Sequence, residues 1–142
     1  MDYKLEVVVV PVSDVDRAKA FYVDRMGFVL DVDHQPNEHF RIVQMTPRGS
    51  GCSVTIGIGL AKMEPGSLQG LQLSVGDIEA VHAELTSRGV PVGAVQHHDG
   101  AGFVDGPGGD YNSFIFFQDP DGNGWAIQQS PLVRAAEAAA SS

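Results

Sequence analysis

The stretch VSDVDRAKAFY at residues 12–22 decides the fold, because the chain repeats its pattern as VGDIEAVHAEL at residues 75–85. Ser13 or Asp14 can cap a helix in the first copy and Asp77 in the second, and apolar side chains follow at helical spacing. Each copy also follows an apolar, β-branched run that is typical of a strand. An internal repeat of this kind predicts two similar structural units.

Each half is expected to have the order strand, helix and three further strands. The predicted strands cover residues 5–12, 28–32, 40–45 and 53–60, and then 68–75, 90–95, 113–117 and 123–129. Residues 34–39 are predicted as a polar turn, and residues 96–112 as a long glycine-rich irregular segment. The helices are expected to end at Gly27 and Gly89. The prediction is an α+β fold of two βαβββ modules in a pseudo-two-fold arrangement, with curved sheets around a cleft.

The length of 142 residues fits one domain that both modules share. We expect module 1 at about residues 4–60, a linker at 61–67, module 2 at about residues 68–130 and a tail at 131–142. The hydrophobic content of 43% is sufficient for a packed core.

Charge and cysteine content exclude several classes of protein. The net charge of -9, without a cluster of Lys or Arg, argues against nucleic acid as a partner. A single cysteine excludes a disulfide framework within the chain and favours the cytoplasm. The sequence shows neither a signal peptide nor an apolar run of membrane-spanning length, so no membrane partner is expected.

Three motifs occur in order along the chain. They are V-x-D-x-x-x-A-x-x-F-Y at residues 12–22, V-G-D-I-E-A at residues 75–80 and F-Q-D-P-D-G-N at residues 117–123. Together with the repeat they resemble the vicinal oxygen chelate superfamily, which includes glyoxalase I, extradiol dioxygenases, fosfomycin-modifying enzymes and bleomycin-type resistance proteins. The resemblance covers about residues 5–129 and implies the fold more strongly than the chemistry, because one fold hosts many reactions.

Metal-dependent members of that family take ligands from the first, fourth, fifth and eighth strands. The resemblance places three of those positions at Val7, Gly70 and Ala126. Residues 53–60, the predicted fourth strand, contain no His, Asp, Glu or Cys. A catalytic divalent metal needs about three His or carboxylate ligands. We therefore expect neither a metal nor another cofactor.

Alternation along the strands predicts which side chains line the cleft. The candidate ligand-binding residues are Val7, Val9, His39, Phe40, Gln44, Thr55, Gly57, Gln72, Phe103, Tyr111, Phe114, Phe116, Ala126 and Gln128. For two strands, alternation does not decide which side chains face the cleft. Either Phe40, Ile42 and Gln44 or Arg41, Val43 and Met45 face the cleft, and either Phe114 and Phe116 or Ile115 and Phe117 do so. Trp125 and Ile127 are expected in the core.

The leading hypothesis is a metal-free protein that sequesters a bulky aromatic small molecule, as bleomycin-type resistance proteins do. No catalytic residue is then expected. One alternative is a glyoxalase-like lyase or isomerase, or another enzyme of the family, in which His39, His97 or His98 acts as acid or base. Another is a non-catalytic accessory protein of a biosynthetic pathway. The resemblance also implies a homodimer.

Overall fold

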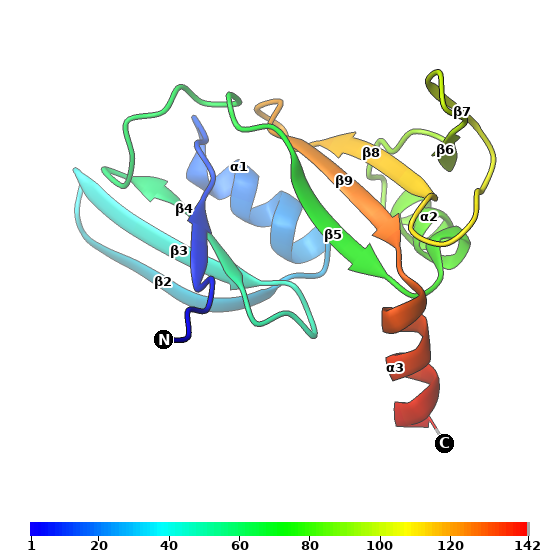
Figure 1. Ribbon diagram of the computed structural model, residues 1–142. Coiled ribbons are helices and arrows are strands. Elements are labelled where there is room, and N and C mark those ends of the chain that lie inside the picture. Colours follow the sequence, from blue (N-terminus) through cyan, green and yellow to red (C-terminus); the bar gives the residue numbers. More distant parts are fainter. Residues whose placement is uncertain (142) are drawn as a thin grey trace. The chain divides into compact units, whose positions relative to one another are not determined.

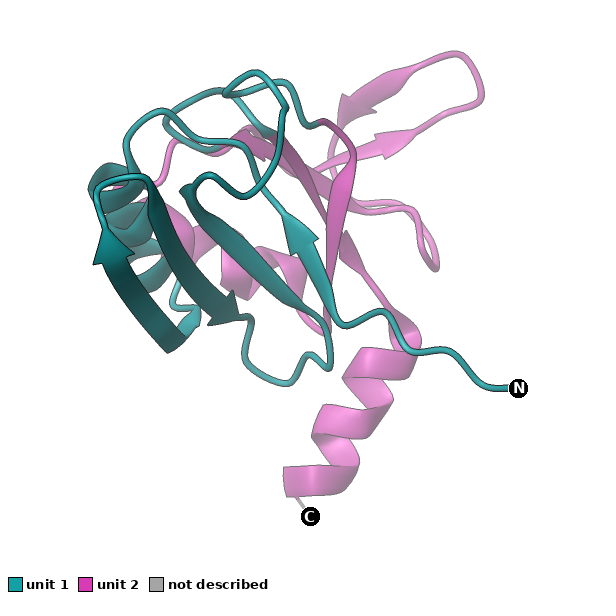
Figure 2. Ribbon diagram, turned by 90° about the vertical axis from the view of Figure 1, so that its left-hand side faces the viewer, with its two compact units in different colours: residues 1–68, 119–123 teal, residues 69–118, 124–142 magenta. Residues whose placement is uncertain are grey.

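The computed structural model describes residues 1–141 and divides into two compact units, coloured separately in Figure 2. Unit 1 is Met1–Leu68 with Asp119–Asn123, and unit 2 is Gln69–Gln118 with Gly124–Ser142. Helices and strands mix in both units, and each unit has its own sheet (Figure 1). The predicted α+β class is therefore confirmed.

Unit 1 is a four-stranded sheet with one helical segment. Its strands lie in the order β1-β4-β3-β2 and span β1 (Val7–Val9), β2 (Val29–Asn37), β3 (Phe40–Thr46) and β4 (Ser53–Ile58). The first pair is parallel and the others are antiparallel. The strand β2 continues through most of the segment predicted as a turn, because His34 and Asn37 pair with β3 and only residues 38 and 39 form the turn.

The helical segment begins as the repeat predicts but contains a wide turn that the sequence did not indicate. Asp14 caps α1 (Val15–Lys19) by accepting a hydrogen bond from the Arg17 amide at 3.0 Å. The segment continues as the π-helix η1 (Ala20–Arg25). It ends before Gly27, whose positive φ of 79° suits a helix C-terminus.

The core of unit 1 lies on one face of its sheet. Val43, Met45 and Ile56 are fully buried, and alternation places them on the same side as the buried Val54. Phe40, Ile42 and Gln44 therefore lie on the face of β3 that is opposite the core.

The F-Q-D-P-D-G-N motif supplies unit 1 with a buried hydrogen-bond cluster. The carboxylate of Asp119 accepts from the Tyr22 hydroxyl at 2.7 Å and from the Asn123 amide side chain at 2.8 Å. It also accepts from the backbone amides of Asp121 and Asn123. Asn123 in turn donates to the Pro11 carbonyl at 2.8 Å. This late segment of the chain therefore fixes an early one.

A second polar cluster stabilises unit 1 at its surface. Asp33 on β2 accepts from the Arg41 guanidinium at 2.9 and 3.0 Å and from Lys19 at 2.8 Å. The hydrogen bonds from Arg41, and then from Lys19, hold the pKa of the Asp33 carboxyl well below its ordinary value. Its contribution to stability is therefore present above the unfolded-state pKa and is lost as the pH falls through the folded-state pKa.

We predict that Asp33→Asn lowers the free energy of unfolding by about 1 kcal/mol at neutral pH. The difference from the wild type should shrink as the pH falls below about 4. Urea unfolding followed by circular dichroism at several pH values checks this, with the exposed Asp24→Asn as control. A difference that grew on acidification would contradict the assignment.

Unit 2 is a five-stranded sheet with two helices. Its strands lie in the order β5-β9-β8-β6-β7 and span β5 (Leu71–Val75), β6 (Gln96–His98), β7 (Phe103–Asp105), β8 (Phe114–Gln118) and β9 (Gly124–Gln129). The helices are α2 (Ile78–Ser87), capped by Asp77, and α3 (Pro131–Ser141). As predicted, Gly89 follows α2 with a positive φ of 78°.

The predicted strand at residues 90–95 is wrong. Only an isolated bridge joins Val92 to Phe117 there, because Pro91 lacks an amide hydrogen while Val90 and Val95 turn into the core. Pairing continues instead in the hairpin of β6 and β7, inside the segment predicted as irregular. No helix in residues 1–141 is long and apolar enough to cross a membrane.

Candidate ligand-binding site

The sheet of unit 2 has one buried face and one open face. Ile115, Phe117, Trp125 and Ile127 are buried, which confirms the expected core role of Trp125 and Ile127. The register of β5, β9 and β8 aligns the remaining side chains in rows on the open face. One row contains Gln72, Ala126 and Phe116, and the next contains Ser74, Gln128 and Phe114. On β8, Phe114 and Phe116 therefore lie on the open face, while Ile115 and Phe117 lie in the core.

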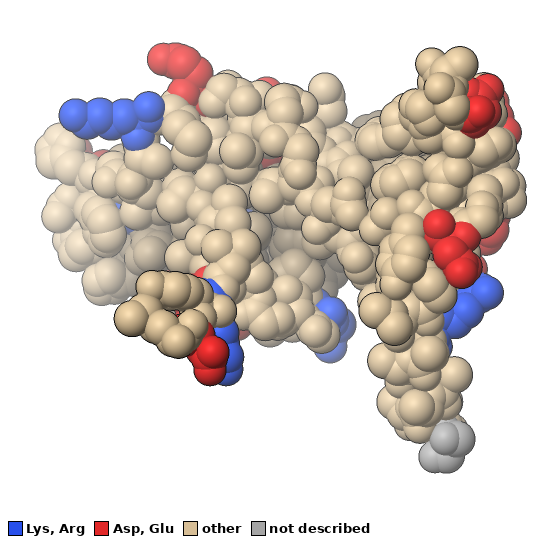
Figure 3. Space-filling model, in the orientation of Figure 1, with Lys and Arg blue, Asp and Glu red and all other residues tan. Residues whose placement is uncertain are grey.

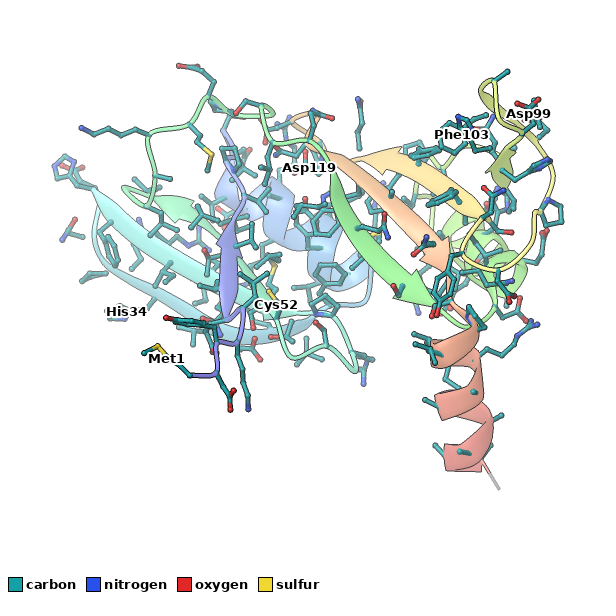
Figure 4. The ribbon with its side chains drawn as sticks, in the orientation of Figure 1. Met1, His34, Cys52, Asp99, Phe103 and Asp119 are labelled. Carbon is teal, nitrogen blue, oxygen red and sulfur yellow. The ribbon has the colours of Figure 1, made fainter. Side chains whose placement is uncertain are left out.

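Three phenylalanine rings cluster on this open face. Phe114 and Phe116 are nearly parallel, with an interplanar angle of 9° and ring centroids 6.0 Å apart. Phe103, from β7, stands edge-on to both, with its centroid 5.7 Å from Phe114 and 5.0 Å from Phe116. Figure 4 shows Phe103 beside β8. Phe103 remains 46% exposed and Phe116 39% exposed, so the cluster presents aromatic surface to solvent.

A chain of amide groups adjoins the phenylalanine cluster. The Gln72 side chain donates to Gln128 Oε1 at 3.0 Å, and Gln128 Nε2 donates to the backbone carbonyl of Tyr111 at 2.8 Å. Gln128 is also the cross-strand partner of Phe114. Polar and aromatic candidates from the sequence therefore meet on one face.

A hollow of about 360 Å³ opens at the end of the same sheet. It is lined by Gln69, Gly70, Phe116, Phe117, Gln118, Gly124, Trp125 and Ala126. Phe116 therefore belongs both to the aromatic cluster and to the hollow. Such a volume, with apolar walls and a few amides, lies within the usual range for a small organic ligand.

Tyr111 adopts a left-handed backbone conformation with φ of 58°. Such a conformation costs an L-residue roughly 1–2 kcal/mol. The carbonyl of Tyr111 is held by Gln128, and its side chain is 44% exposed. The strain therefore occurs where the loop after β7 meets the amide chain.

We predict that Tyr111→Gly raises the free energy of unfolding by up to about 1 kcal/mol, since glycine adopts this conformation without strain. Thermal and urea unfolding measure the change, and Tyr111→Phe, which keeps the strain, should match the wild type. A destabilised glycine variant would show instead that the ring contributes to packing.

Candidates in unit 1 also share the face opposite the core, with one exception, and on that face Val7 and Phe40 are exposed while Thr55 is buried. Val9, Gln44 and Thr55 are neighbours across β1, β3 and β4, and Val7, Phe40 and Gly57 lie on the same side by register and alternation. His39 does not join them. Its side chain is 86% exposed in the hairpin turn and lies 3.3 Å from Glu38.

The paired histidines hold the backbone of the β6–β7 hairpin. His97 Nδ1 lies 2.9 Å from the Gly106 carbonyl, and His98 Nδ1 accepts from the Gly100 amide at 3.1 Å. Between them and the loop tip, the amides of Ala101 and Gly102 donate to Asp99 and lower the pKa of its carboxyl. These contacts support a structural role for the three residues.

Sequence reasoning missed Gln69 and Gln118 as residues that line the hollow. Gln118 could have been found, because it lies two residues beyond Phe116 and therefore on the same face of β8. Gln69 carries no such signal, because alternation along the predicted strand at residues 68–75 places it on the opposite face from Gln72.

Comparison with known proteins decides the family. The model of the Glyoxalase/Bleomycin resistance protein/Dioxygenase superfamily matches residues 4–127. The chain belongs to this superfamily. The resemblance drawn from its three motifs is therefore confirmed, and the comparison with curated proteins found no match.

Solved structures of the superfamily share this fold. TnmS3, an antibiotic binding protein from Streptomyces sp. CB03234, is 37% identical over 91% of this chain and 97% of its own, with a TM-score of 0.72. A glyoxalase/bleomycin resistance protein from the same organism is 38% identical over 89% of this chain and 100% of its own, with a TM-score of 0.69. A superfamily member from Sphaerobacter thermophilus DSM 20745 is 26% identical over 91% of this chain and 98% of its own, with a TM-score of 0.72.

The residues of this chain do not fit the metal centre known from the superfamily. The hollow presents glutamine amides but no His, Asp, Glu or Cys side chain. Gly70 has φ of +90°, so a ligating side chain placed there would strain the backbone. Across residues 1–141, no three His, Cys, Asp or Glu side chains come together as a metal site requires.

Proposed function

We propose that this superfamily member binds a bulky aromatic small molecule, such as an antibiotic, and protects by sequestering it without chemical change. The observation that carries the proposal is the exposed cluster of Phe103, Phe114 and Phe116 beside the hollow. Aromatic surface and neutral amides suit stacking and hydrogen bonding of an organic ligand. The similarity to an antibiotic binding protein supports the same conclusion.

The proposed contacts are the candidates on the two open faces. In unit 2 they are Gln72, Phe103, Tyr111, Phe114, Phe116, Ala126 and Gln128, and in unit 1 they are Val7, Val9, Phe40, Gln44, Thr55 and Gly57. We drop His39 from the set, because its exposed side chain in the turn lies near only Glu38 among the groups described.

We further propose a metal-free homodimer in the cytoplasm, with the module boundaries at residues 4–60 and 68–130 expected from the sequence. Without metal ligands at Val7, Gly70 and Ala126, the chain lacks the groups that would hold the Lewis acid of the metal-dependent members. The single cysteine favours the reducing compartment.

Fluorescence titration with a panel of aromatic antibiotics tests the proposal. The protein is dialysed first against EDTA and then in parallel against zinc, nickel, iron and manganese. We expect a dissociation constant well below millimolar that does not depend on the metal. One tightly held metal per chain, together with activity that requires it, would establish an enzyme instead.

A further inference from the structure

The hydrogen-bonding groups around the phenylalanine cluster of unit 2 are all uncharged. On β5, β8 and β9 the open face carries Gln72, Ser74, Phe114, Phe116, Gln118, Ala126 and Gln128. The hollow adds Gln69 and two glycines. In Figure 3, most of the surface seen over β5 and β9 is formed by uncharged side chains, with carboxylates at its edges. This neutrality stands out in a chain with a net charge of -9.

Charged and titratable groups near the cluster are few. The ring of His98 stands edge-on to Phe103, with centroids 5.2 Å apart, and its Nδ1 accepts from the Gly100 amide. The sequence has no Lys or Arg between Arg88 and Arg134. On the β6–β7 hairpin, Asp99 accepts from two backbone amides, and Asp105 accepts from the Gln96 side chain at 3.1 Å. Figure 4 shows Asp99 farther out on the hairpin than Phe103. An ionised group on a ligand would therefore lose its hydration on this face without finding an opposite charge.

The amide chain is oriented by the backbone. A carbonyl can only accept, so Gln128 must turn Nε2 toward Tyr111 and Oε1 toward Gln72. Gln72 must then donate, and each glutamine keeps one further N–H. Within residues 1–141 no partner is seen for Gln72 Oε1. Fixed donors and an acceptor beside an aromatic surface suit carbonyl and hydroxyl groups of a ligand.

We propose that unit 2 selects aromatic ligands that are uncharged where they meet the phenylalanine cluster and that carry hydroxyl or carbonyl groups at the edge of the ring system. This selectivity rests on the proposed binding function and names the chemical class that the site accepts. Anions are disfavoured twice, by the negative field of the chain and by the loss of hydration. Cations are attracted by the field and weakly by the faces of the phenylalanine rings, but this face of β5, β8 and β9 carries no carboxylate to offset their lost hydration.

Three probes that share one ring system distinguish attraction by the net charge of the chain from selection by the site itself. They are anthracene-9-methanol, 9-(aminomethyl)anthracene and anthracene-9-carboxylate, titrated against the full chain by fluorescence near neutral pH. Sodium chloride at about 1 M shortens the Debye length to roughly 3 Å and screens the field. We expect the neutral alcohol to bind at least about tenfold more tightly than either ion under these conditions. Equal or tighter binding of an ion would overturn the inference.

A charge placed in the site provides the matched test. Gln72→Glu should weaken binding of the alcohol about tenfold and strengthen binding of the amine, because it removes the donor to Gln128 and adds a carboxylate. Ala83→Glu adds the same charge on the exposed surface of α2 and should change neither dissociation constant. If Gln72→Glu leaves the dissociation constant of the alcohol unchanged, the inference is contradicted.

The outcomes also distinguish the two proposals. If aromatic antibiotics bind but an ionic probe is preferred at high salt, the proposed function survives and the selectivity is wrong. If neither the probes nor any aromatic antibiotic binds, both are wrong.

Discussion

Replacing Phe116 with alanine is expected to weaken the binding of aromatic ligands by roughly ten- to hundredfold. Phe116 is the one ring shared by the aromatic cluster and the hollow among the described residues, so its loss removes contacts on both sides. Its ring is 39% exposed, and the variant should therefore stay folded, with a stability loss of about 1 kcal/mol. Isothermal titration and thermal unfolding together check the two expectations.

A matched control comes from the N-terminal segment. Tyr3→Ala removes an aromatic ring that is 86% exposed and far from β8 in sequence, and it should leave the affinity unchanged. If the folded Phe116→Ala variant binds as well as the wild type, the cluster is not the ligand site.

Asp119→Ala is expected to lower the free energy of unfolding by about 3–5 kcal/mol. The carboxylate accepts four hydrogen bonds in a buried setting, and alanine accepts none of them. Because the bond from Tyr22 attaches residues 119–123 to the early part of unit 1, and the other three shape that segment, the loss should also weaken the cooperativity of unfolding. Chemical denaturation with intrinsic fluorescence measures both.

The exposed Asp110→Ala serves as control and should change stability by less than about 0.5 kcal/mol. Asp119→Asn keeps part of the acceptor capacity and should fall between the two. A loss of less than about 1 kcal/mol in Asp119→Ala would show that the cluster contributes little.

The helix signals in the sequence were reliable because they are local. Asp14 and Asp77 cap the helices, and the glycines that follow them have positive φ. The π-helix in the first helical segment, where Phe21 and Tyr22 are buried in the core, was not predictable from the sequence. Helical periodicity alone does not distinguish it from a regular helix.

Errors in the strands arose where tertiary pairing overrides local composition. Residues 34–37 are polar and look like a turn, yet pairing with β3 extends the strand through them. Residues 90–95 contain three valines and look like a strand, but Val90 and Val95 are buried in the core and only Val92 makes an isolated bridge. The hairpin that actually forms pairs Gln96–His98 with Phe103–Asp105, and each of its strands is only three residues long, too short for a clear alternating pattern.

Alternation predicted the content of the candidate site better than its location. It grouped Gln72, Ala126 and Gln128 on one face of unit 2, as the register shows. Alternation could not decide which face of β3 and of β8 points inward, because both faces of each strand carry apolar side chains. Which face is buried depends on tertiary contacts. The hollow also needed the structure, since it depends on how the ends of β5, β8 and β9 are arranged.

Equilibrium dialysis of the EDTA-treated protein against an aromatic antibiotic, followed by mass spectrometry of the recovered compound, tests sequestration most directly. The account predicts saturable uptake by the protein and recovery of the compound with its mass unchanged after prolonged incubation. Recovery of a converted product, or no uptake of any aromatic compound, would contradict it.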